Sequence, residues 1–157
     1  MCCKSFARTV PTNYYLLFTF TVCQSFFVAH VCSFYETSVV LMIAAMTATI
    51  TVVISIFAIK TETDFTTAEM FCPILLASMV CLLICSIFMT FSSWWHPVYA
   101  GILVIMYGLY LVHDTQLIAG DKKYALSYDD YIVGALIVYI DIVMLFIELL
   151  RVFGDAK

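Results

Sequence analysis

The sequence predicts an all-α protein, a polytopic transmembrane helical bundle. Hydrophobic residues make up 64% of its 157 residues, charged residues make up 11%, and the mean hydropathy is +1.06. The apolar residues also fall in runs of about 20, the length at which a helix crosses a hydrocarbon core about 30 Å thick. A water-soluble globule of this size would carry far more polar surface. We therefore expect one transmembrane domain that covers residues 1–157.

Five apolar runs predict about five membrane spans. They cover approximately residues 13–32, 37–59, 71–91, 97–119 and 127–153. The first run is too long for a signal peptide and has no small-residue cleavage site before the next span, so it predicts a membrane helix. Pro97 suits the first turn of the fourth helix, and Gly154 suits the end of the fifth.

The second span carries a regular polar stripe. Thr47, Thr51 and Ser55 recur every four residues beside Ala44 and Ala48. Small residues at this spacing let helix backbones approach closely, so we favour helix packing. The alternatives are a stripe that lines a water-filled path, or a face that binds another membrane protein.

The distribution of basic residues predicts a cytoplasmic N-terminus. Basic side chains before the first span and in alternate loops are Lys4, Arg8, Lys60, Lys122 and Lys123. By the positive-inside rule these segments face the cytoplasm. Five crossings would then place Arg151 on the opposite side, against the same rule, whereas a re-entrant last segment would remove that conflict.

Two acidic residues, Asp114 and Asp141, lie inside the last two apolar runs. A carboxylate near the bilayer centre costs about 2.5–3.5 kcal/mol on insertion scales, so such residues are candidates for function. Neither core segment contains Lys or Arg, so each carboxyl has to be protonated, be hydrated or bind a cation. Glu148 differs because Arg151 lies three residues further along the same helix face, which predicts an ion pair.

Brought together, Asp114 and Asp141 would form a proton-sensitive gate or a cation site. Two adjacent carboxylates in a low-dielectric site cannot both ionise easily, and they titrate as a unit. Calcium prefers oxygen ligands, and Thr115, Gln116 and backbone carbonyls are nearby supporting groups. On a helix, the His113 side chain points about 100° away from that of Asp114, so this neighbouring pair is a poor metal chelator.

Helix geometry alone does not bring the two aspartates together. Asp114 lies six residues before Gly120, and Asp141 lies fourteen residues after Ser127. For straight, upright helices this is a difference in membrane depth of roughly 12 Å. Tilt or a helix break would have to close that gap.

Several motifs in order along the chain resemble the Bax-inhibitor family, in particular its lifeguard branch. They are Ser33-Phe-Tyr-Glu-Thr37, Ile56-Phe-Ala-Ile-Lys-Thr61, Asp64-Phe-Thr66, His113-Asp-Thr-Gln-Leu-Ile118 and Tyr139-Ile-Asp-Ile142. The resemblance implies a seven-helix bundle with a central last helix, in the endoplasmic reticulum or Golgi, with the plasma membrane as the alternative. It also implies a calcium leak controlled by an aspartate pair, matched here by Asp114 and Asp141, and restraint of apoptosis.

The chain departs from that family at its N-terminus. Family members have a cytosolic segment and two further helices before the position where this chain begins, so we expect a truncated form that holds helices three to seven. The arginine on the missing second helix, which is thought to latch the aspartate pair, has no counterpart here.

The leading functional hypothesis is therefore a pH-sensitive calcium leak channel that restrains apoptosis, with calcium as the transported ion and no cofactor. The alternatives are a non-conducting regulator that binds membrane or apoptosis-regulating proteins, or an inactive short form. We do not expect an enzyme. An intramembrane aspartyl protease is disfavoured because Asp141 lies in Tyr-Ile-Asp-Ile and not in Gly-x-Gly-Asp. The absence of a basic stripe in the sequence argues against a nucleic-acid partner.

Overall fold

The chain folds into membrane-length helices in the parts that a computed structural model describes, which are residues 9–66, 77, 78, 80, 95–119 and 130–154. Four helices in these ranges are long and apolar enough to cross a membrane, and the described residues hold no strand. They are α2 (Thr12–Cys32), α3 (Thr37–Lys60), α5 (Trp95–Ala119) and α6 (Tyr131–Phe153). These helices confirm an all-helical membrane protein and match four of the predicted spans. The predicted span 71–91 lies outside the described residues except for 77, 78 and 80, which are helical.

The last helix differs from its prediction at one end. α6 begins at Tyr131, whereas the apolar pattern predicts a start at Ser127, and residues 127–129 lie outside the described part of the chain. α6 then runs without a break over 23 residues, about 34 Å at 1.5 Å per residue, which is enough to cross the hydrocarbon core. This continuous helix favours a full crossing over a re-entrant segment. Gly154 ends the helix as predicted, and its N–H donates to the Leu150 carbonyl at 2.7 Å.

Three threonine hydroxyls in α2 and α3 are satisfied by their own helices. Thr21, Thr47 and Thr49 each donate to the backbone carbonyl four residues earlier, at 2.8–2.9 Å. A side chain that bonds to its own helix needs no partner in lipid, where an unsatisfied polar group costs several kcal/mol. These threonines are therefore compatible with a membrane span without lining a water path.

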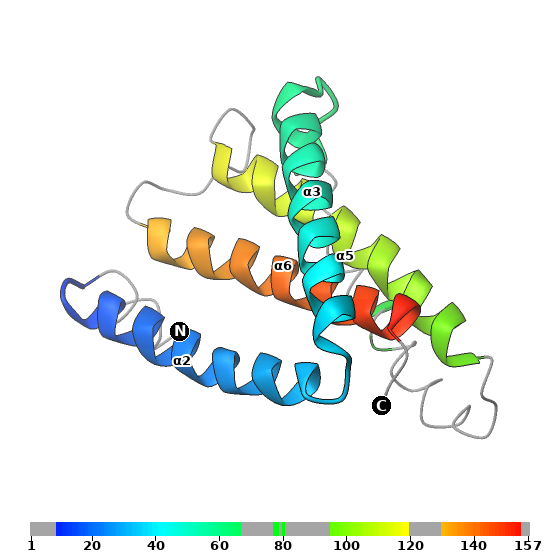
Figure 1. Cartoon of the computed structure of the whole chain (residues 1–157). Coiled ribbons are helices and arrows are strands. Elements are labelled where there is room, and N and C mark those ends of the chain that lie inside the picture. The colour runs from blue at the N-terminus through cyan, green and yellow to red at the C-terminus, as the bar shows by residue number, and fades with distance from the viewer. Residues whose placement is uncertain (1–8, 67–76, 79, 81–94, 120–129, 155–157) are drawn as a thin grey trace.

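α6 is the central helix of the described bundle because it packs against α2, α3 and α5. Figure 1 shows α6 between α2 and α5, with α3 crossing both α6 and α5. A cluster of buried side chains joins α3 to α6, formed by Ile43, Leu145, Leu149 and Leu150. The central position of the last helix agrees with what the family resemblance implies.

Contacts near the helix ends show how the chain runs. The start of α2 meets the start of α6, where Tyr131 Oη donates to Tyr14 Oη at 3.0 Å and Asn13 Nδ2 donates to Tyr131 Oη at 3.4 Å. The end of α3 meets the end of α5, where Gln116 Nε2 donates to the Ala58 carbonyl at 3.1 Å. Hence α2 and α6 run in one direction, and α3 and α5 run in the other.

The outer faces of the bundle are strongly apolar. Phe26, Phe18 and Tyr15 on α2 expose 69–74% of their surface, and Leu41 and Val53 on α3 expose 60–66%. Large exposed apolar side chains along whole helices suit contact with lipid acyl chains rather than with water. The protein is therefore an integral membrane protein.

Candidate functional site

The two aspartates lie on α5 and α6, which make the most extensive contact in the described bundle. Gly134 on α6 permits this close packing. A Cβ atom at that position would lie 3.1 Å from Ile118 Cγ1 on α5, which is tighter than ordinary van der Waals contact. Because Gly134 has no side chain, α5 and α6 approach closely at Ile118, which lies four residues after Asp114 on α5.

The structure brings Asp114 and Asp141 together. Their carboxyl groups interact, by a hydrogen bond when they share a proton and by repulsion when both are charged. Both are largely shielded, since Asp141 is 7% exposed and the Asp114 side chain is 13% exposed. The second oxygen of Asp141, Oδ2, is buried without a hydrogen-bond partner.

The actual helix ends account for part of the depth difference expected from the sequence. Asp114 lies five residues before the end of α5 at Ala119, and Asp141 lies ten residues after the start of α6 at Tyr131. The offset is then five residues, about 7.5 Å along an upright helix, in place of roughly 12 Å. The two carboxyls interact despite the remaining offset.

His113 contacts Asp114 directly, which helix geometry did not predict. His113 Nδ1 lies 2.8 Å from Asp114 Oδ1, and His113 is 7% exposed. The 100° separation describes the directions in which the two Cβ atoms leave the helix, and rotation of both side chains brings their ends together. The expectation that the two side chains point apart was therefore wrong, although a two-residue contact is still no chelating set.

Gln116 is occupied elsewhere. It is 1% exposed, its Nε2 donates to the carbonyls of Ala58 and Thr63 at 3.1 and 2.9 Å, and its Oε1 accepts from the Phe65 N–H at 2.9 Å. Gln116 thus fastens α5 to the end of α3 and to the segment that follows it. Thr115, the other predicted supporting residue, has a buried Oγ1 without a hydrogen-bond partner.

Glu148 and Arg151, the other charged residues of α6 besides Asp141, pair with each other. Arg151 Nη1 lies 3.1 Å from Glu148 Oε1, which confirms the predicted ion pair. Within these helices, the basic side chain in contact with the aspartate pair is the imidazole of His113. Tyr107 on α5 lies within electrostatic range of Asp141 and Glu148.

Comparison with known proteins places the whole chain in one family. The model of the family described as inhibitors of apoptosis-promoting Bax1 matches residues 1–157. The chain belongs to the Bax-inhibitor family. The match covers every helix described above, including both aspartates.

Named relatives place this Bax-inhibitor family member near the lifeguard proteins. It is 35% identical to human protein lifeguard 3 over 159 residues, covering 99% of this chain and 51% of the relative. The mouse protein lifeguard 3 is 36% identical, with 98% and 51% covered. Protein LIFEGUARD 4 of Arabidopsis thaliana is 31% identical, with 94% and 59% covered. The chain thus spans about half the length of the lifeguard 3 proteins, and these names describe no enzymatic activity.

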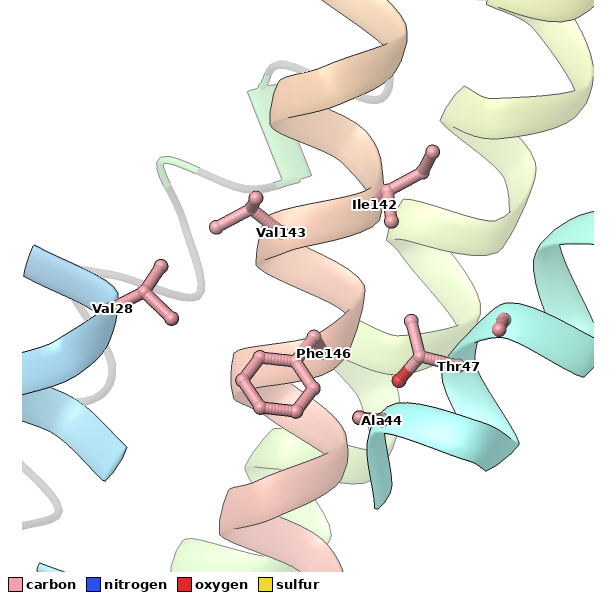
Figure 2. Close-up of a pocket in the computed structure, with 7 residues that line it drawn as sticks. Val28, Ala44, Thr47, Ile142, Val143 and Phe146 are labelled. Atoms are coloured by element: carbon pink, nitrogen blue, oxygen red, sulfur yellow. The ribbon is translucent and has the colours of Figure 1, made fainter. Parts of the chain in front are cut away.

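A separate apolar pocket lies between α2, α3 and α6 of this family member (Figure 2). Its volume is about 290 Å³, and its lining residues are Val28, Ala44, Thr47, Ala48, Ile142, Val143 and Phe146. Asp141 is next to Ile142 in sequence but is not part of this lining. The pocket therefore suits an apolar occupant and is distinct from the carboxyl pair.

The calcium site predicted from the sequence has two side-chain ligands, Asp114 and Asp141. Among the described residues, no group of three or more His, Cys, Asp or Glu side chains is placed to hold a metal ion. Calcium takes six to eight oxygen ligands, so waters or backbone carbonyls would have to complete a site built on two carboxylates. Asp114 and Asp141 would each contribute carboxylate oxygens to such a site.

Proposed function

We propose that this Bax-inhibitor family protein is a pH-sensitive calcium leak in an intracellular membrane, in the endoplasmic reticulum or Golgi, and that it restrains apoptosis. The observation that carries the proposal is the shielded pair of carboxyls on α5 and α6, in which one oxygen of Asp141 has no hydrogen-bond partner. Acidic groups inside a membrane bundle are costly and typically mark ion or proton pathways.

The chemistry of the pair supports a gate that responds to protons. When the two carboxyls share a proton, a hydrogen bond can join α5 to α6. When that proton leaves, two negative charges face each other at low dielectric, and either the helices separate or a cation enters between them. Rising pH therefore favours cation binding at Asp114 and Asp141, and falling pH favours the closed, proton-sharing pair.

Calcium release from proteoliposomes tests this function. The purified chain is reconstituted with calcium inside, and release is followed across a pH series for the wild type and for Asp114→Asn and Asp141→Asn. We expect the wild type to release calcium in a pH-dependent way. Each variant should lose most of that release and its pH response, since an amide carries no titratable proton.

Asp64→Asn is the matched control for that experiment. Asp64 lies in the segment after α3, where its Oδ1 accepts hydrogen bonds from the backbone N–H and the hydroxyl of Thr66. The same chemical change is thus made away from the pair and should leave calcium release intact. A variant Asp141→Asn that keeps both the flux and its pH response would refute the gate.

The alternative is a non-conducting regulator that binds a partner through the polar stripe on α3. Thr47, the first hydroxyl of that stripe, is 3% exposed and lines the pocket between α2, α3 and α6. Ala44 and Ala48 beside it are exposed, so the stripe keeps an accessible face for such a partner. A folded chain that releases no calcium at any pH would support the non-conducting regulator or the inactive form.

A further inference from the structure

We propose that His113 is a positioning residue, which holds the Asp114 carboxylate against Asp141 by donating a hydrogen bond from its Nδ1–H. The part of this proposal that concerns calcium rests on the proposed function. The part that concerns the orientation of the carboxyl does not, and it can be tested separately.

The charge of Asp114 determines the donor in this contact. An ionised carboxylate only accepts hydrogen bonds, so when Asp114 is ionised the proton lies on His113 Nδ1, which is 2.8 Å from Asp114 Oδ1. The same bond fixes the tautomer of the ring and the rotation of the Asp114 side chain about its bond to the helix. With one oxygen held by His113, the carboxyl has a fixed orientation toward α6.

The surroundings make this orientation dependent on His113. The side chains of His113 and Asp114 are 10% and 13% exposed, so water has little access to replace the imidazole. A shielded carboxylate that loses its donor retains a costly unpaired oxygen and turns toward any other donor. On the opposite side of the pair, Asp141 Oδ2 is buried without a hydrogen-bond partner, whereas Asp114 Oδ1 has the His113 contact.

Groups that hydrogen-bond to metal-binding side chains in other proteins indicate how strongly loss of the His113 imidazole should affect calcium release. Removing a group that orients a metal ligand typically reduces metal affinity or activity about 10–100-fold. We therefore expect loss of the imidazole donor to slow calcium release about 10-fold or more. An amide that donates from nearly the same place should restore most of it.

Two readouts test the proposal on the full chain. Infrared spectra of protein with carbon-13-labelled aspartate, with the Asp114→Asn spectrum subtracted, isolate the carboxyl band of Asp114, which responds to hydrogen bonding. Calcium release from proteoliposomes is measured on the same preparations. The variants are His113→Phe, which keeps a ring but no donor, and His113→Asn, which keeps a donor. His113→Ala replaces the Phe variant should that protein fail to fold.

His30→Phe is the matched control. His30 lies on α2, and its ring packs edge-on against Phe34 with ring centroids 5.1 Å apart. The same substitution there should change neither the Asp114 band nor calcium release.

We expect the Asp114 band to shift in His113→Phe and to return toward the wild-type position in His113→Asn, with calcium release following the same order. An unchanged band in His113→Phe, or a His113→Asn variant no closer to the wild type than His113→Phe, would overturn the proposal. Failure of the proposed function has a different signature. The band would still shift in His113→Phe, which supports the positioning role, while Asp114→Asn and Asp141→Asn leave calcium release unchanged.

Discussion

In lipid, a polar side chain needs hydrogen-bond partners within the protein, and this need accounts for the contacts of Thr47 and Gln116. A hydroxyl that bonds to its own helix, as in Thr47, needs nothing else and can face any direction. A carboxamide has more groups to satisfy, and Gln116 satisfies them with three backbone groups around the end of α3. Gln116 is therefore a structural link between α5 and α3, located two residues from Asp114.

Replacing Gln116 by Leu should loosen the segment that follows α3. The variant leaves the Phe65 N–H and the carbonyls of Ala58 and Thr63 without their partner, and a buried group left unsatisfied costs about 1–3 kcal/mol. We expect a lower free energy of unfolding in detergent by about that amount and faster hydrogen exchange at the Phe65 amide. Gln24→Leu is the matched control on α2. Unchanged exchange at Phe65 would contradict the link.

Some residue roles are predictable from the sequence and others are not. The Glu148–Arg151 ion pair follows from spacing along one helix, because side chains three residues apart share a face. The contact between His113 and Asp114 depends on side-chain rotation, which Cβ directions do not report. The partners of Gln116 belong to the end of another helix and to an irregular segment, whose position no periodicity gives.

Helix packing determines which residues of neighbouring helices lie at the same depth in the membrane. The apolar pattern predicts the four described helices with small errors at their ends, because a run of about 20 apolar residues has one stable arrangement in lipid. It does not predict the register between α5 and α6. That register depends on the close approach at Gly134 and on a start of α6 at Tyr131, and together these bring Asp141 to Asp114.

Adding a side chain at Gly134 should force α5 and α6 apart. Gly134→Val places methyl groups beyond a Cβ that already lies 3.1 Å from Ile118 Cγ1, and overpacking of this kind costs about 1–3 kcal/mol. We expect a lower free energy of unfolding in detergent.

Two further variants show whether the contact with Ile118 causes that loss. Ile118→Ala combined with Gly134→Val should recover part of the lost free energy, as a double-mutant cycle would reveal. Gly101→Val, where a Cβ would meet nothing within 4 Å, is the control. Equal losses of unfolding free energy in Gly101→Val and Gly134→Val would show that the close contact with Ile118 is not the cause.

At the scale of the whole molecule, the directions of the helices constrain how the chain crosses the membrane. α3 and α5 run the same way, since Ala58 meets Gln116 and a Cβ at Gly108 would meet Ile54. Two helices that cross a membrane in the same direction require a crossing between them, which is the position of the predicted span 71–91. Ser78, within the predicted span 71–91, donates from Oγ to Met106 Sδ near the middle of α5 at 3.9 Å. These contacts favour the prediction of five crossings.

Chemical labelling from one side of the membrane tests that topology. In a version with its seven cysteines replaced, single cysteines are introduced by Glu62→Cys after α3 and by His96→Cys at the start of α5. A reagent that cannot cross sealed, oriented vesicles should label these two positions from opposite sides, because an odd number of crossings separates them. Thr9→Cys, before α2, should be labelled from the same side as Glu62→Cys. The start of α2 meets the start of α6, and the start of α6 packs beside the end of α5, which meets the end of α3. Labelling of positions 62 and 96 from the same side would rule out a membrane crossing between α3 and α5 and with it the five-span topology.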